Sequence, residues 1–386
     1  MAKKLLYAAS GGEAFATIDD MTTALSMVTD KSPSATSSPD YDPPHMELNK
    51  TITAMGLVNE SWFIGAHYHG LLWTPPIPCS DIEVAADGFK YVETSIVVYH
   101  TQTDQNLVDS YPLSFRVGST SGNYSTSSGS GVIHARLIDG GLTVSGDGSI
   151  TIHSITSTNT IDILPNEVYY LTLRVSSCSS ANTDDGIYAL YVNGVKYIEG
   201  TWRSGVTAIA TFADTYETQL RSWPQYVYCR DMLLWSGWTT DGVRIPPSPY
   251  IVTDMVPNSV TTNAGGTPIG GTEAEVISDN DDATYVELDG PTAHLVVRQN
   301  SGVDPAVAGK DVAAIISYVK IARGGISPTD VELEHYEVQV GLGDPYIYIG
   351  ESVSPVFDNI RFATMPSTSV SPNDLTLLIS NIDPDE

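Results

Sequence analysis

The stretch Tyr188-Ala-Leu-Tyr-Val-Asn-Gly-Val-Lys-Tyr-Ile198 decides the fold class of this chain. Two runs rich in tyrosine and aliphatic residues, which favour the pleated surface of a strand, flank the pair Asn193-Gly194. Asparagine followed by glycine tolerates the positive φ that both central residues of a type I′ turn require. The stretch therefore predicts a β-hairpin with its turn at these two residues.

Strand-like runs of the same kind continue on both sides of the hairpin. They are separated by clusters of Gly, Pro, Asn, Asp and Ser, without alternating helical periods. The clearest cover residues 61–68, 90–100, 113–117, 131–138, 149–154, 168–175, 187–192 and 232–235, and later 274–277, 283–288, 293–299, 312–322, 331–340, 346–349 and 375–380. Strands at this frequency indicate antiparallel sandwiches or jelly rolls, so we expect an all-β fold.

The chain has 386 residues, a length that favours more than one domain. Residues 1–45 mix small, polar and apolar types and are interpreted as an extended N-terminal arm. A jelly roll is expected over 46–242, and a second β-sandwich over 258–386. Between them, residues 243–257 carry four prolines, which stiffen an extended connection and cannot donate to a central ladder.

Several runs of the first domain resemble the concanavalin A-like, laminin-G-like jelly roll. They are Trp62-Phe-Ile-Gly65, the strand YVETSIVVYH at 91–100, the run 167–175, and the hairpin at 188–196. In the second domain, residues 256–264, 278–287 and 371–379 resemble the C-terminal β-sandwich modules of tailed-bacteriophage structural proteins.

Together these resemblances imply a virion structural protein on the particle surface, assembled in the host cytoplasm. The expected role is head decoration or a head fibre, with a tail or adhesion component that binds carbohydrate through the jelly roll as the alternative. The implied partners are major capsid or tail proteins, further copies of the chain in a homo-oligomer, and host surface glycans. The N-terminal arm would be buried against a neighbouring subunit.

Charge and composition exclude several other partners. Lys and Arg total 18 against 46 Asp and Glu, and the net charge of −28 opposes binding to nucleic acid or to anionic lipid. No apolar run is long enough to span a bilayer, so no membrane is expected. Cys79, Cys178 and Cys229 are far apart and form no zinc or disulfide pattern, which predicts reduced thiols.

Two acidic clusters are candidates for a cation site. Asp279, Asp281 and Asp282 lie together, and Asp184 and Asp185 precede a glycine. Carboxylate oxygens are the ligands that Ca²⁺ prefers, but neither cluster has the spacing of an EF-hand, and both also suit polar turns. We therefore expect no cofactor, with Ca²⁺ at these residues as the alternative.

Sequence motifs for catalysis are missing. Glu332 and Glu334 share one strand face and could mimic a glycosidase pair, but the pair lies in the second domain and a solvated strand face is the favoured interpretation. No nucleophile elbow, P-loop or dinucleotide fingerprint occurs, so the chain is expected not to be an enzyme. On the same strand we expect Val331 and Leu333, and after a bulge Val338 and Val340, to face the core.

Tryptophan and tyrosine gather between residues 202 and 238. We expect Tyr228, Leu233 and Trp235 to fill the core of the first sandwich. Trp223 and Trp238 stand in turn-like contexts, and rings with a polar edge are common where proteins stack on sugars or contact subunits. These two residues are therefore the candidates for a carbohydrate or subunit contact.

Overall fold

The structure is a computed structural model of the whole chain. It describes residues 3–10, 21, 23–25, 28–30, 45–49, 62–66, 70–74, 77–100, 109–118, 130–138, 141–155, 162–213, 215–223, 227–237, 239–240, 243–244, 250, 252, 257, 259–277, 283–290, 292–298, 311–322, 330–337, 340–348, 358–370 and 375–382.

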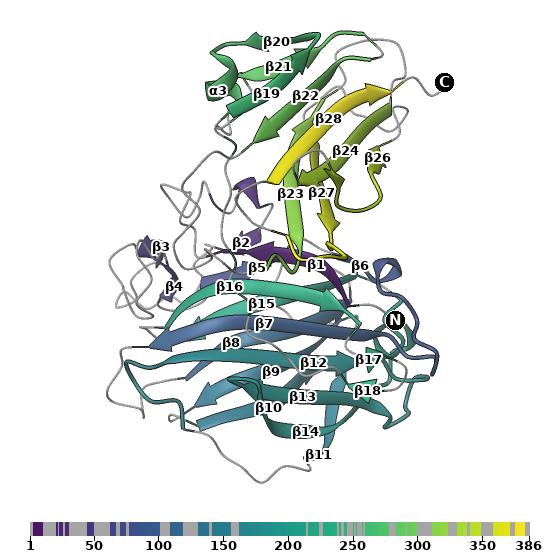
Figure 1. Cartoon of the computed structure of the whole chain (residues 1–386). Coiled ribbons are helices and arrows are strands. Elements are labelled where there is room, and N and C mark those ends of the chain that lie inside the picture. Colours follow the sequence, from purple (N-terminus) through teal and green to yellow (C-terminus); the bar gives the residue numbers. More distant parts are fainter. Residues whose placement is uncertain are drawn as a thin grey trace. The chain divides into compact units, whose positions relative to one another are not determined.

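The chain divides into two compact units, Met1–Val252 and Thr253–Glu386. Both consist almost entirely of antiparallel strands (Figure 1), so the predicted all-β class is confirmed. The division falls inside the predicted linker, residues 243–257. In the described part of the chain, no helix is long and apolar enough to cross a membrane.

The first unit contains a nine-stranded sheet with the order β11-β14-β13-β12-β7-β16-β4-β3, in which β1 also pairs with β16. Its strands are β1 (Lys4–Ala9), β3 (His45–Asn49), β4 (Trp62–Ala66), β7 (Tyr91–His100), β11 (Ile150–Ile155), β12 (Val168–Ser176), β13 (Gly186–Val192), β14 (Val195–Ser204) and β16 (Val227–Ser236).

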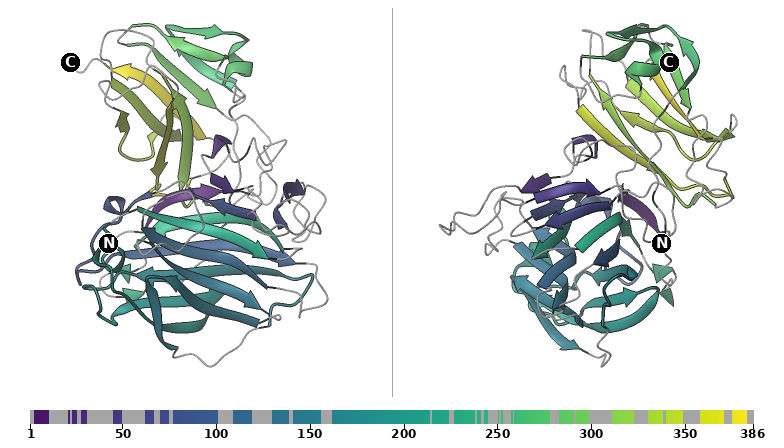
Figure 2. Two further views of the ribbon diagram at one scale, coloured as in Figure 1. Left: turned by 180° about the vertical axis from the view of Figure 1, so that it is seen from behind. Right: turned by 90° about the vertical axis from the view of Figure 1, so that its left-hand side faces the viewer.

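A seven-stranded sheet lies against it as the second layer (Figure 2). Its order is β10-β9-β8-β15-β5-β2, with β6 paired to β15. The strands are β2 (Val28–Asp30), β5 (Gly70–Trp73), β6 (Ile77–Pro78), β8 (Asp109–Gly118), β9 (Ser130–Ile138), β10 (Gly141–Gly148) and β15 (Thr215–Trp223).

Aromatic side chains fill the space between the two sheets. Phe115 of β8 meets Phe212 with ring centroids 5.3 Å apart, and Phe212 stacks on Trp202 of β14. Burying each large apolar side chain contributes about 1.5–3 kcal/mol, so this layer stabilises the contact between the sheets.

Leu233 and Trp235 are buried, but they pair with Ser95 and Glu93 on the opposite face of the nine-stranded sheet, so the prediction that they fill the space between the sheets is wrong. The side chain of Tyr228 lies outside the described residues.

The predicted hairpin is confirmed. Asn193 and Gly194 join β13 to β14 with φ of 50° and 78°, as a type I′ turn requires. Gly186, at the start of β13, serves a different purpose, because a Cβ there would lie 2.5 Å from Nε1 of Trp202. Asp184 and Asp185 lie in a turn, and Gly186 after them begins β13 at a point of close packing.

The first residues of the predicted arm belong to the sandwich itself. Lys4–Ala9 form strand β1, which pairs with β16 from Lys4 opposite Ser236 to Ala9 opposite Met232. Leu5 to Ala9 are all buried, and the hydroxyl of Tyr7 donates to the carbonyl of Leu25. The interpretation as an arm is thus corrected for residues 4–9 and 28–30, which pair with β16 and β5. A short apolar run buried on both faces lacks the alternation that marks a half-buried strand.

The second unit packs a six-stranded sheet, β19-β22-β28-β24-β25 with β26 on β24, against the pair β23-β27. A further pair is β20-β21. The bounds are β19 (Ser259–Ala264), β20 (Gly266–Ile269), β21 (Tyr285–Leu288), β22 (His294–Arg298), β23 (Ile315–Ile321), β24 (Asp330–Glu337), β25 (Val340–Gly341), β26 (Tyr346–Tyr348), β27 (Asp358–Thr364) and β28 (Leu375–Ile382).

Two expectations for this unit need correction. Val331 and Leu333 face the core as predicted, but the next inward position of β24 is His335, and Val340 is 66% exposed. Val338 lies outside the described residues. The predicted strand at 274–277 is the helical turn α3 (Glu273–Val276), because Thr272 and Glu275 form a capping box there.

Candidate functional site

Several of the predicted site residues lie outside the described residues. These are Asp279, Asp281 and Asp282 of the calcium hypothesis, and Trp238 of the carbohydrate hypothesis. Trp223 is the last residue of β15, where its backbone pairs with Asp109 of β8. The predictions made for these residues remain predictions.

Asp184 and Asp185 are described, and protein groups already contact both carboxylates. Oδ1 of Asp184 lies 3.3 Å from Nε2 of His153 and 3.5 Å from Nε of Arg203. Oδ1 of Asp185 accepts a hydrogen bond from the backbone N–H of Ser179. Among the residues that the structure describes, no group of three or more His, Cys, Asp or Glu side chains is arranged to hold a metal. Calcium at this pair stays an untested prediction.

Glu332 and Glu334 each accept a hydrogen bond from a neighbouring side chain. Oε2 of Glu334 accepts from the hydroxyl of Tyr336 at 2.5 Å, and Oε2 of Glu332 accepts from Ser380 at 3.4 Å. Both carboxylates are thus hydrogen-bonded to side chains of the same sheet, as is usual on the face of a strand.

A grid of polar side chains lies on strands β8, β9 and β10 of the seven-stranded sheet. Ser114, His134 and Ser145 are register partners across the three strands and form one row. Arg136 and Thr143 are partners in the next row, two residues along each strand. Because strand side chains alternate in direction, all five share one face of the sheet. We call these residues, with Tyr111, Arg116 and Asp147, the polar grid.

The neighbours of the grid in sequence identify its face. Phe115, between Ser114 and Arg116, points into the core, where it meets Phe212. The polar grid therefore lies on the outer face of the sheet, away from the nine-stranded layer. The solvent exposure of the grid increases from β8 and β9 to β10. Ser114, Arg116 and His134 are buried, Ser145 is half-buried, and Asp147 on β10 is exposed.

His134 is the centre of the grid. Its Nδ1 lies 2.7 Å from Oγ of Ser114. Its Nε2 has no hydrogen bond to the described residues. Burial lowers the pKa of His134 to about 4, against the opposing charge of Asp147, so the ring is neutral at pH 7. A neutral imidazole offers one donor and one acceptor.

Tyr111 supplies an aromatic surface beside the histidine. The ring centroid of Tyr111 lies 4.6 Å from the ring centroid of His134. The guanidinium carbon of Arg136 lies 5.5 Å from the ring centroid of Tyr111. The ring is half-buried. Tyrosine, imidazole and guanidinium thus lie side by side, with Thr143 and Ser145 in the same rows. The group combines an aromatic ring with hydrogen-bonding side chains.

Sequence reasoning did not find this grid. The signal was present in the run Gly131-Val-Ile-His-Ala-Arg-Leu-Ile138, where His134 and Arg136 alternate with apolar residues. That alternation marks two polar positions on one outer face. It does not reveal that Ser114, twenty residues earlier, lies opposite the histidine, because strand register is a tertiary property.

No protein-family model and no curated protein matches the chain. Solved structures similar to it include an endo-1,3-beta-glucanase from Streptomyces sioyaensis. The match covers 61% of this chain and 96% of the glucanase chain, at 10% identity and a TM-score of 0.36. Lectin II from Ulex europaeus covers 54% and 96% at 12% identity and a TM-score of 0.29. A carbohydrate esterase from the Shiga toxin-encoding bacteriophage phi24B covers 61% and 99% at 11% identity and a TM-score of 0.31. At such low TM-scores the fold class rests on the strand pairing described above.

Proposed function

We propose that the first unit is a carbohydrate-binding jelly roll that performs no covalent chemistry, and that the polar grid is its binding face. The observation that carries the proposal is the neutral His134, with Nε2 unbonded among the described residues, beside the half-buried ring of Tyr111. Sugars present hydroxyls that both donate and accept, and apolar ring faces that stack on aromatic side chains. The grid offers a partner for each of these features.

The arginines narrow the class of sugar. Arg136 lies over Tyr111, and Arg116 pairs with Val132 in the row on the other side of His134. A guanidinium suits a carboxylate or several hydroxyls. The grid therefore favours glycans with vicinal hydroxyls or a carboxylate. The net charge of −28 disfavours highly sulfated or phosphorylated polymers.

The geometry of Ser114 and His134 supports binding rather than catalysis. A nucleophilic serine needs an exposed hydroxyl and a base whose pKa lies near the working pH. Ser114 is fully buried, and a histidine with a pKa of about 4 is a weak base at neutral pH. We propose on these grounds that the chain is not an enzyme and needs no cofactor for this role, with Ca²⁺ at Asp184 and Asp185 as the alternative.

A glycan array followed by titration calorimetry on the full chain tests the binding proposal. We expect binding to a subset of oligosaccharides, and at least tenfold weaker affinity in His134→Phe, which keeps the ring but removes both nitrogens, and in Arg136→Ala. Arg203→Ala, on β14 of the other sheet, is the matched control and should bind like wild type. Binding that is unchanged in both grid variants would place the sugar elsewhere, and no binding on the array would refute the proposal.

We further propose that the chain is a structural protein on the surface of a tailed-phage virion, as head decoration or a head fibre, with a tail or adhesion role as the alternative. The sequence resemblances at 256–264, 278–287 and 371–379 and the high negative charge support this. Counting copies of the chain against the major capsid protein by mass spectrometry of particles tests it. Similar copy numbers indicate decoration, a small number indicates a tail or fibre, and absence refutes the virion role.

A further inference from the structure

A pocket lies beside the end of β24 in the second unit. Its volume is about 390 Å³, within the range of about 300–1,000 Å³ that small-molecule sites occupy. One wall is formed by the end of β24 with β25, and the other by the segment that follows β27. The described lining residues are Glu337, Val340, Gly341, Leu342, Ser367 and Thr368. All of them belong to the second unit, so the pocket is a different site from the polar grid of the first unit.

The wall formed by β24 and β25 is fixed by strand pairing and by the core. Glu337 pairs with Val340 across the two strands, and the backbone N–H of Leu342 donates to the carbonyl of His335. The side chain of Leu342 packs against Val370 in an apolar cluster. This wall is therefore in place before any ligand binds.

The second wall is held by two contacts just after the pocket residues. The backbone N–H of Val312 donates to the carbonyl of Val370, and the hydroxyl of Ser369 donates to Oδ1 of Asp311. These contacts anchor the loop immediately after its two lining residues. Because both walls are anchored, a ligand does not have to order them, which favours binding.

Three lining side chains offer oxygen atoms to a ligand. Ser367 and Thr368 are exposed, and their hydroxyls accept hydrogen bonds. The carboxylate of Glu337 has about four acceptor sites, so it can bind a ligand in addition to its contacts within the protein. The described lining contains no Lys, Arg or His, so it brings a negative charge and no positive one.

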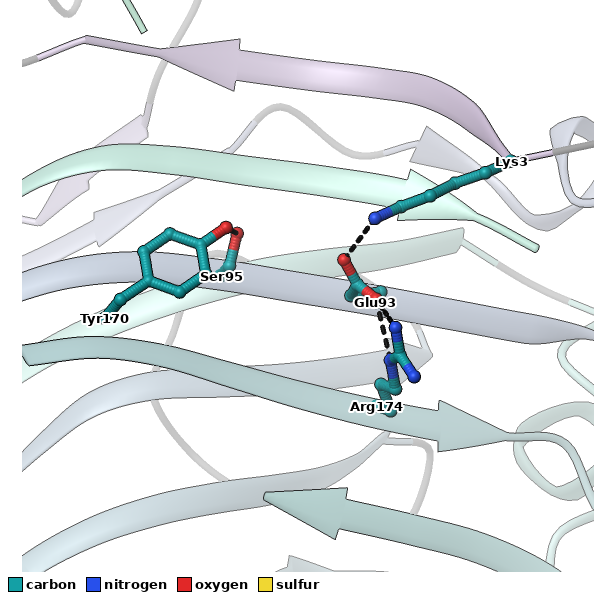
Figure 3. A network of polar contacts seen from close by, with 5 residues as sticks. All are labelled: Lys3, Glu93, Ser95, Tyr170 and Arg174. Atoms are coloured by element: carbon teal, nitrogen blue, oxygen red, sulfur yellow. Dashed lines mark hydrogen bonds and ion pairs between the residues drawn. The ribbon is translucent and has the colours of Figure 1, made fainter. Parts of the chain in front are cut away.

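The buried carboxylate of Glu93 in the first unit shows how this chain neutralises a carboxylate with its own cations. Nε and one terminal nitrogen of Arg174 lie 2.7 and 2.6 Å from Oε2 of Glu93, and Nζ of Lys3 lies 2.5 Å from Oε1 (Figure 3). Residues 253–386 have few cations for this purpose, with 5 Lys and Arg against 21 Asp and Glu. The second unit therefore attracts cationic ligands and repels anionic ones.

The rest of the pocket is aliphatic. Leu342 is buried, whereas Val340 is 66% exposed and lies at the mouth. Aliphatic walls suit a methylene chain, and the described lining has no aromatic ring on which a sugar could stack. The pocket therefore fits a short aliphatic chain better than a sugar.

We propose that this pocket binds a primary alkylammonium group. An ammonium has three N–H donors and no acceptor, which match the carboxylate and the two hydroxyls, while its aliphatic chain contacts Val340 and Leu342. Such a group occurs in free diamines and in the lysine side chains of other proteins, and the pocket chemistry is the same for both. This inference does not depend on glycan binding or on a virion role.

Methyl NMR of the full chain tests the proposal. Titration with cadaverine, a free diamine, and with Nα-acetyl-lysine methylamide, a lysine in a peptide-like backbone, should shift the methyl signals of Val340 and Leu342. Pentanol, which keeps the aliphatic chain but lacks an ammonium group, should bind at least tenfold more weakly. Tighter binding of the lysine derivative would identify a protein as the source, and tighter binding of cadaverine a free amine. Signals that stay unmoved with both amines would overturn the proposal.

Glu337→Gln separates a contact in the pocket from general attraction by the acidic unit. This variant should bind both amines at least fivefold more weakly than wild type, and Thr368→Val, at an exposed position, at least twofold more weakly. Glu287→Gln removes the same charge from an exposed residue of β21 in the same unit, and this matched control should bind like wild type. Equal affinities of the two glutamine variants would show that overall charge attracts the amines and would refute the pocket as their site.

Discussion

Two buried histidines, one in each unit, have similarly lowered pKa values but different numbers of hydrogen bonds. Burial lowers the pKa of both His134 and His335 to about 4. His335 is bonded on both nitrogens, with Nε2 at 2.7 Å from Ser317 and Nδ1 at 2.7 Å from Thr364. His134 has one such bond among the described residues, to Ser114.

The two histidines therefore differ in how many ring nitrogens are hydrogen-bonded, and not in burial or in the direction of the pKa shift. The ring of His335 also stacks on Phe362 at 4.3 Å, so it links the two sheets of the second unit. It has no atom left for a ligand. His134 is held by Ser114 through Nδ1, and in the proposed binding site its Nε2 would bond a sugar hydroxyl.

The largest expected effect comes from removing the saturated histidine. His335→Ala leaves the hydroxyls of Ser317 and Thr364 unpaired and opens a cavity beside Phe362, so it should destabilise the second unit by about 4 kcal/mol. Hydrogen exchange of peptides from β24 measures this locally. His294→Ala, on β22 of the same unit, is the control and should change stability by less than about 0.5 kcal/mol. A loss for His335→Ala no larger than the control's would contradict its structural role.

An intermediate effect should appear on acidification. Both histidines titrate near pH 6.5 when unfolded and near 4 when folded, so the unfolded state binds more protons in that window and stability falls as the pH falls through it. The loss is about 3 kcal/mol for each histidine. Urea unfolding at a series of pH values measures this loss of unfolding free energy. In His134→Phe, the part of the loss that comes from His134 in the first unit should disappear. Assigned NMR signals of His134 or His335 that titrate near pH 6.5 in the folded protein would contradict this prediction.

The smallest effect concerns the charge beside His134. Asp147 is exposed, and its carboxylate raises the pKa of His134 against the effect of burial. Asp147→Asn should therefore move the NMR titration of His134 slightly lower, while the titration of His335 stays unchanged. An upward shift of His134 would show that Asp147 does not act through its charge.

Strand periodicity and turn chemistry predicted much of the fold. The Asn193-Gly194 hairpin, the all-β class and the inward faces of Val331 and Leu333 follow from local preferences that the tertiary structure preserves. β1 was missed because its apolar run has no alternation. Its partner β16 lies far along the chain, and no local signal reports such a pairing.

The candidate site was predicted less well. Sequence reasoning favoured residues that stand out in composition, such as the acidic pairs and Trp223. The polar grid instead combines single residues from three strands, none of them conspicuous alone. Ser114 and His134 meet only because β8 and β9 pair in one register, and a shift of one residue would turn either side chain to the opposite face.

By itself the sequence determined what depends on neighbours along the chain: strand positions, the type I′ turn, the net charge and the absence of familiar catalytic motifs. The tertiary structure alone decided what depends on distant partners: that Lys3 reaches Glu93, that His134 meets Ser114, and that His335 is bonded on both nitrogens. The physical reason is that backbone preferences act over a few residues, whereas burial and strand register are fixed only when distant strands pair and pack.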